Sequence, residues 1–156
     1  MTEPKIGVYG GSFDPFTKGH ADIVKRALAL VDELHIVVGV NIHKTPFMPL
    51  EERLQRLETL YRSEPRVHVT SHQGILARYA HSVGANVLIR GIRNTYDLEA
   101  ERPLAEVNRQ KFGVETIFLL ADPTLSSVSS SLVRELADFG ESYDEYLPVD
   151  NTGTRI

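Results

Sequence analysis

The chain has 156 residues, of which 42% are hydrophobic and 24% charged, so it fits one soluble globular domain with an apolar core and does not fit a disordered protein. The net charge of −4 argues against a general nucleic-acid-binding or membrane-binding surface, and any polyanion site must therefore be a local basic pocket. The absence of cysteine excludes disulfides, zinc–thiolate sites and thiol nucleophiles.

Five short apolar runs predict β-strands, and segments with helical periodicity lie between them. The strands are expected at Ile6–Tyr9, Leu34–Val40, Val67–Thr70, Asn86–Ile89 and Thr116–Leu120. Apolar stripes predict helices within residues 23–31, 50–61, 75–83, 97–112 and 132–137. Pro103 lies inside the fourth of these segments, so a kink or a displaced start is expected there.

The alternation of strands and helices predicts an α/β fold with a five-stranded parallel Rossmann-like sheet of order 3-2-1-4-5 and helices on both faces. We expect a single domain over residues 1–149 and a loose polar tail over residues 150–156. In this topology the first and fourth strands are neighbours. A ligand is expected in the crevice at their carboxyl ends.

The segment that follows the first strand, YGGSFDPFTKGH, is the most informative part of the chain. Gly10 and Gly11 let the backbone approach a ligand closely, and His20 falls in the first turn of the next helix, where anions are attracted. A tight strand–helix turn with a purely structural histidine is the simpler alternative. The fixed spacing of the whole segment favours a phosphate site.

Three further segments carry polar residues that suit a phosphate ligand. Residues 90–93, Arg-Gly-Ile-Arg, leave the predicted fourth strand at the crevice, and guanidinium groups pair well with phosphate oxygens. A serine-rich stretch over residues 125–131 precedes the fifth helix, and Lys44 follows the second strand. The remaining histidines at positions 35, 68, 72 and 81 are expected at the surface or at the edge of the core.

Several of these motifs resemble those of a known enzyme family. Residues 17–20, Thr-Lys-Gly-His, resemble the (H/T)xGH hallmark of a nucleotidyltransferase superfamily. The run over residues 88–93 and the segment around Lys44 resemble the phosphopantetheine adenylyltransferase branch. The family motif S-x-x-I-S-S-(S/T) is similar to residues 126–131, with Val128 at the isoleucine position.

The resemblance implies transfer of the adenylyl group of ATP to 4′-phosphopantetheine, which gives dephospho-CoA and pyrophosphate without a covalent intermediate. It also implies Mg²⁺ bound mainly through the ATP phosphates, a homohexamer, and CoA as a feedback inhibitor. We expect a cytoplasmic protein without nucleic-acid or membrane partners, because there is no signal-like segment and no membrane-length apolar run.

The family's functional residues fall on matching positions of this chain. Catalytic roles are implied for His20, Lys44 and Arg93. ATP contacts are implied for Ser12, Phe13, His20, Arg90, Gly91, Ile92, Arg93, Glu101, Leu125, Ser126, Ser127, Val128, Ser129, Ser130 and Ser131. Contacts with the acceptor are implied for Ser12, Lys44, Leu76 and Arg90. An exposed helical position without a ligand is an equally good interpretation of Glu101.

Two departures from the family pattern keep other functions open. Gly10 stands where the pantetheine branch usually has proline, and the sequence GGSFDP is similar to nicotinate mononucleotide adenylyltransferases. Leu125 stands where many members carry tryptophan. The alternatives are a nicotinate mononucleotide adenylyltransferase, a cytidylyltransferase, or a nucleotide-binding regulator that has lost catalysis.

Overall fold

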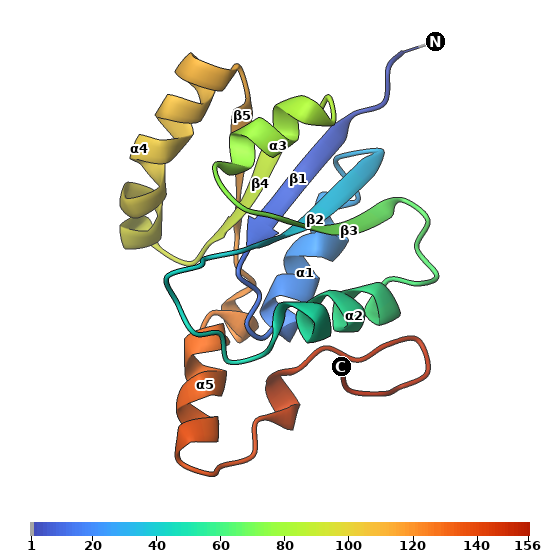
Figure 1. The fold of residues 1–156 in the computed structure, drawn as a ribbon, viewed down its shortest axis with the longest axis vertical. Coiled ribbons are helices and arrows are strands. Elements are labelled where there is room, and N and C mark those ends of the chain that lie inside the picture. Colours follow the sequence, from blue (N-terminus) through green and yellow to red (C-terminus); the bar gives the residue numbers. More distant parts are fainter. Residues whose placement is uncertain (1) are drawn as a thin grey trace.

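The fold is built on one parallel sheet, seen in a computed structural model that describes residues 2–156 (Figure 1). Its strands are β1 (Ile6–Gly11), β2 (Glu33–Gly39), β3 (Val67–His72), β4 (Val87–Ile92) and β5 (Glu115–Leu120). The sheet order is β3-β2-β1-β4-β5, and every adjacent pair is parallel. The predicted strand number, direction and order are therefore confirmed.

Helices cover both faces of this sheet. Figure 1 shows α3 (Leu76–Ser82) and α4 (Thr95–Phe112) on one face and α1 (Lys18–Ala27) and α2 (Leu50–Leu60) on the other. Helix α5 (Ser130–Asp138) follows a short 3₁₀ turn at Pro123–Leu125 and lies at the carboxyl edge of the sheet (Figure 1). No helix among residues 2–156 combines the length and the hydropathy that a membrane span requires.

Successive side chains of a strand point to opposite faces of the sheet, so the core is divided into two apolar layers. Tyr9, Ile36 and Ile89 pack with α1 and α2 in one layer, whereas their neighbours Val8, Val37 and Leu88 pack with α3 in the other. Strands buried on both faces need nearly continuous apolar sequence, which is why β1, β2 and β4 could be recognised from short runs of Val, Ile and Leu.

Two expectations about boundaries need correction. Helix α4 runs without interruption from Thr95, so the displaced start considered for Pro103 is wrong; the αL residue Gly113 (φ 67°) ends the helix as expected. Strand β4 extends to Ile92, so most of the Arg-Gly-Ile-Arg segment lies within the strand and only Arg93 follows it. These residues continue the hydrogen-bonded pairing with β5, which sequence periodicity alone does not reveal.

The C-terminal segment is folded back on the domain, unlike the loose tail that was expected. Val149 and Arg155 form an antiparallel bridge, and Asp150 accepts hydrogen bonds from the backbone N–H groups of Thr152 and Thr154. The guanidinium of Arg155 also donates to the carbonyl of Leu147. Polar composition indicated exposure, but these local turn contacts order the backbone.

Candidate active site

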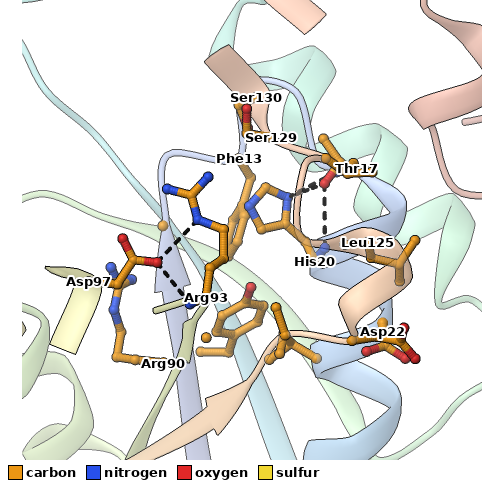
Figure 2. Close-up of a pocket in the computed structure, with 18 of the residues that line it drawn as sticks. Phe13, Thr17, His20, Asp22, Arg90, Arg93, Asp97, Leu125, Ser129 and Ser130 are labelled. Atoms are coloured by element: carbon orange, nitrogen blue, oxygen red, sulfur yellow. Dashed lines mark hydrogen bonds and ion pairs between the residues drawn. The ribbon is translucent and has the colours of Figure 1, made fainter. Parts of the chain in front are cut away.

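A cavity of about 520 Å³ opens at the carboxyl ends of β1 and β4, where the topology predicted a ligand. Its walls come from the end of β1, the loop to α1, the end of β4 and the start of α5 (Figure 2). The lining includes Ser12, Phe13, His20, Arg90, Gly91, Arg93, Leu125, Val128, Ser129, Ser130 and Ser131. Residues far apart in the sequence are thus brought together at one site.

Two helix N-termini meet at this cavity. Thr17 is the N-cap of α1 and Ser129 is the N-cap of α5, and both residues line the cavity. The first N–H groups of each helix have no intrahelical partner, and the helix dipoles add partial positive charge at the same ends. The segment from Gly10 to His20 and the serine-rich start of α5 thus line the same cavity, and this arrangement suits an anionic ligand.

The imidazole of His20 is held by the cap of its own helix. The backbone N–H of Thr17 donates to Nδ1 of His20 at 3.0 Å, completing a capping box in which His20 N–H donates to the Thr17 hydroxyl (Figure 2). Since Nδ1 accepts this bond, the ring proton resides on Nε2. Burial, with a smaller effect of the Arg90 charge, lowers the pKa of His20 to about 4. His20 is therefore a neutral hydrogen-bond donor at physiological pH.

The ring of Phe13 packs against His20, and the backbone of Phe13 is strained. Phe13 has a positive φ of 46°, a conformation that is unfavourable for a bulky residue. Its ring packs edge-on against the imidazole, with ring centroids 5.1 Å apart. Strain of this kind persists where surrounding contacts fix the chain, and it is common at functional sites.

Long-range hydrogen bonds brace the loop between β1 and α1. The buried carboxylate of Asp14 accepts the N–H groups of Phe47 and Met48 at 2.7 and 2.8 Å, joining this loop to the one before α2. Buried Arg53 of α2 donates to the carbonyl of Ser12 at 2.7 Å. From the opposite side, Arg134 of α5 donates to the carbonyl of Asp14 at 2.8 Å.

These bracing residues were missed by sequence reasoning. The sequence alone assigned no role to Asp14, Arg53 or Arg134. Their partners lie 34, 41 and 120 positions away, so no local pattern could indicate them. A charged residue within an otherwise apolar helix face was the one available signal, and it applies to Arg53.

Arg93 enters the cavity from the end of β4. Its side chain and backbone N–H both donate to the carboxylate of Asp97, at 3.1 and 2.8 Å (Figure 2). These two bonds lower the pKa of the Asp97 carboxyl, so it stays ionised and holds the guanidinium in place. A cation thus oriented beside His20 and the serine-rich helix start can neutralise charge on a bound phosphate.

A second cavity of about 440 Å³ shares one wall with the first. Gly10, Gly11 and Arg90 line both cavities. Arg90 donates through Nε and Nη2 to the carboxylate of Glu101 at 3.1 and 2.7 Å, and through Nη1 to the carbonyl of Gly10 at 2.7 Å. The remaining lining of the second cavity comes from α4, including Leu104 and Ala105, from the start of α3 at Leu76 and from the neighbouring strands.

The backbone at Gly10 packs closely against Leu76 within this shared wall. A Cβ atom placed at Gly10 would overlap the side chain of Leu76. Gly10 therefore has a structural reason to depart from the proline usual in the pantetheine branch, because it admits Leu76 over the strand. The departure does not by itself indicate another acceptor.

Some predicted site residues lie elsewhere. Glu101 and Leu76 line the second cavity and not the first, and Glu101 is paired there with Arg90, which lines both cavities. Lys44 is exposed in the loop before α2 and lines neither cavity, and the same holds for Ser126, Ser127 and the buried Ile92. All other residues for which ATP or acceptor contacts were implied line one cavity or both.

Comparison with known proteins assigns the family. Residues 8–136 match the cytidylyltransferase-like family model. The chain is 44% identical over 143 residues to a phosphopantetheine adenylyltransferase of Porphyromonas gingivalis, covering 92% of this chain and 94% of that relative. The chain belongs to the phosphopantetheine adenylyltransferase family. It is also 42% identical to the relative of that name from Thermotoga neapolitana, over 91% of this chain and 89% of the relative.

Solved structures with lower sequence identity share the fold. A bifunctional NMN adenylyltransferase/ADP ribose pyrophosphatase from Francisella tularensis superposes with a TM-score of 0.71 at 16% identity, covering 92% of this chain and 45% of that one. The NadR protein in complex with NAD and AMP-PNP gives a TM-score of 0.61 at 20% identity, covering 88% of this chain and 43% of that one. At such identities the likeness concerns the fold alone.

Proposed function

We propose that the protein transfers the adenylyl group of ATP to 4′-phosphopantetheine, giving dephospho-CoA and pyrophosphate in coenzyme A biosynthesis. The observation that carries this proposal is the pair of cavities that meet at Gly10, Gly11 and Arg90. A transfer reaction needs two substrates whose reacting atoms meet, and two cavities with one common wall provide that arrangement. The names of the relatives identify the acceptor that this proposal adopts.

ATP would occupy the first cavity with its phosphates toward the two helix N-termini. His20 would donate from Nε2 to a phosphate oxygen, and Arg93 would contribute positive charge from the facing wall. Ser12 and the serines at the start of α5 would contribute hydroxyl and N–H donors. Thr17 holds the imidazole of His20 and Asp97 holds the guanidinium of Arg93, so little reorganisation would accompany charge movement during the reaction.

The acceptor would occupy the second cavity. Leu76, Leu104 and Ala105 offer an apolar surface for the extended pantetheine arm. The guanidinium of Arg90 lies at the wall common to both cavities, where the acceptor phosphate must approach ATP. Glu101 would serve here by holding Arg90 through two hydrogen bonds, in place of the ATP contact that the resemblance implied.

The reaction would be a direct displacement at phosphorus. An oxygen of the acceptor phosphate attacks the α-phosphorus of ATP, and the bond from that phosphorus to the oxygen bridging toward the β-phosphate breaks. Pyrophosphate leaves with the electron pair. The acceptor phosphate is already ionised and nucleophilic, so a strong general base is not required. Positioning and charge neutralisation by His20, Arg90 and Arg93 would supply the catalysis.

Lys44 would act from the loop before α2. This loop is tied to the β1–α1 loop by the hydrogen bond from the N–H of Phe47 to the carboxylate of Asp14. Phe47 lies three positions after Lys44. We propose that the Lys44 side chain extends to the phosphates when both substrates are bound. Unchanged turnover of a Lys44→Ala variant would exclude Lys44 from the mechanism and would leave the rest of the proposal intact.

Mg²⁺ fits the donor set of the first cavity as an ion held by the nucleotide. The carboxylates that line this cavity already have partners: Asp22 pairs with Arg26, Asp97 with Arg93, and Asp122 accepts two bonds from Thr124. No three metal-ligating side chains gather at this cavity within residues 2–156. Mg²⁺ bound through the phosphates and water would withdraw charge from the leaving pyrophosphate.

We also propose a homohexamer in the cytoplasm with CoA as a feedback inhibitor, in line with the family resemblance. Helix α4 exposes apolar side chains that an assembly could cover, among them Tyr96 and Val107. Light scattering of the purified protein would give its mass in solution. Inhibition by CoA would be measured as competition against 4′-phosphopantetheine and against ATP separately.

Pyrophosphate release with a panel of substrates tests the proposed reaction. The purified protein would be assayed with ATP or CTP and with 4′-phosphopantetheine, nicotinate mononucleotide or glycerol phosphate. We expect release only with ATP and 4′-phosphopantetheine. Release with nicotinate mononucleotide or with CTP would favour the alternative transferases. ATP binding without release for any acceptor would indicate a nucleotide-binding regulator.

A further inference from the structure

A cluster of metal-ligating side chains lies on the sheet, apart from both cavities. Glu33 and His35 are on β2 and His68 is on β3, and each offers one ligand atom within 4.8 Å of the other two. The parallel register pairs His35 directly with His68, and Glu33 lies two positions before His35 on the same face. The ring centroids of the two histidines are 4.8 Å apart.

Neighbouring groups orient these side chains. The hydroxyl of Tyr79, on α3, lies 2.7 Å from Nδ1 of His35, and Nε2 of His68 lies 3.5 Å from a carboxylate oxygen of Glu33. When Nδ1 donates to Tyr79, Nε2 of His35 is left unprotonated. A histidine held in this way by a second partner is the usual arrangement for a metal-ligating imidazole.

We propose that Glu33, His35 and His68 bind a single divalent transition-metal ion of the zinc class. Two imidazoles and one carboxylate suit Zn²⁺, Co²⁺ or Ni²⁺, whereas Mg²⁺ prefers oxygen ligands alone. Three protein ligands leave further coordination positions to water, because His68 and Glu33 are partly exposed.

The ion would connect three elements of the domain. Ligands on β2 and β3 would connect the edge strand β3 to β2 through the ion. Tyr79 would link the ion to α3 through its hydrogen bond with His35. Glu33, His35 and His68 line neither cavity, so metal binding can be measured without substrate. An ion that binds only the folded state also stabilises it by mass action, which gives a second measurement.

Calorimetric titration of tag-free, nucleotide-free protein with Zn²⁺ tests the proposal, with the visible absorption of bound Co²⁺ as a spectroscopic check. We expect one ion per chain and a rise in melting temperature on adding Zn²⁺. His68→Ala, at an exposed position, should weaken binding at least about tenfold, and Tyr79→Phe should weaken it about tenfold because it removes the partner of His35.

His81→Ala is the matched control, because His81 is an exposed histidine that lies on α3 and does not belong to the cluster. It should bind Zn²⁺ as the wild type does. Circular dichroism would confirm that each variant is folded. The proposal is overturned if His68→Ala keeps wild-type affinity, if His81→Ala loses as much as His68→Ala, or if no stoichiometric ion binds.

Discussion

The backbone N–H of Thr17 donates to Nδ1 of His20 at 3.0 Å, so the N-cap of α1 also sets the tautomer of the imidazole at the candidate active site. One hydrogen bond thus stabilises the start of the helix and orients the imidazole that we propose binds a phosphate. Since the same interaction is available to a glutamine at this position of a capping box, the two roles can be separated experimentally.

His20→Gln should retain the helix cap and lose the imidazole donor. We expect kcat for adenylyl transfer to fall about 100- to 1,000-fold, as for the loss of one oriented donor to a developing charge. The free energy of unfolding near neutral pH should change by less than about 1 kcal/mol, because the cap is preserved. Pyrophosphate release and urea denaturation measure the two effects. Wild-type turnover in this variant would exclude His20 from catalysis.

The partly buried imidazole should also make stability depend on pH. Burial lowers the pKa of His20 from 6.5 to about 4, so in this interval the unfolded chain binds a proton that the folded protein does not. Stability is therefore fully present above about pH 6.5 and falls toward about pH 4, by roughly 1.4 kcal/mol for each pH unit. Urea denaturation across this pH interval should show that the free energy of unfolding depends less steeply on pH in His20→Gln than in the wild type. Identical slopes in the two proteins would contradict the shifted pKa.

The sequence predicted the sheet order and the main walls of the cavity because both depend on local patterns. Apolar runs identify β1, β2 and β4, and the glycine-containing and serine-rich motifs directly precede the apolar stripes of α1 and α5. The topology of parallel sheets then brings Gly10, His20 and Ser129 to one edge. Inference from spacing was sufficient for these groups.

What the sequence could not predict depends on side-chain partners. Glu101 was assigned by resemblance to ATP, but it is paired with Arg90 in the second cavity. Lys44 has the predicted loop position, yet an exposed side chain in a loop has no packing that fixes where it points. The bracing by Asp14 and Arg53 joins positions distant in the chain, for which one sequence contains no signal.

Asp14→Ala should destabilise the protein more than an equivalent surface change. Removal of the buried carboxylate leaves the N–H groups of Phe47 and Met48 without their acceptor, at about 1–3 kcal/mol for each unsatisfied donor. Asp32→Ala is the control, because its carboxylate accepts one exposed backbone N–H, from Lys5. Denaturant unfolding gives both values. Equal losses in the two variants would show that Asp14 does not brace the loops.

Arg90→Lys should weaken use of the acceptor more than binding of ATP. Lysine keeps the charge but cannot hold the forked contact with Glu101 and the carbonyl of Gly10 together. The loss of charge-assisted hydrogen bonds predicts a decrease of about 10- to 100-fold in kcat/KM for 4′-phosphopantetheine. Arg109→Lys, on the exposed side of α4, should have no effect. A decrease confined to ATP would move Arg90 to the nucleotide side of the wall.

Gly10→Ala tests the close approach between β1 and α3. The added methyl group would overlap Leu76, so the helix or the leucine must move, and both form the second cavity. We expect KM for 4′-phosphopantetheine to rise while KM for ATP changes less. If steric overlap is the cause, Leu76→Ala should relieve it, with a coupling free energy of about 0.5–3 kcal/mol between the two changes. Additive effects in the double variant would mean that Gly10 acts through the backbone of β1 and not through Leu76.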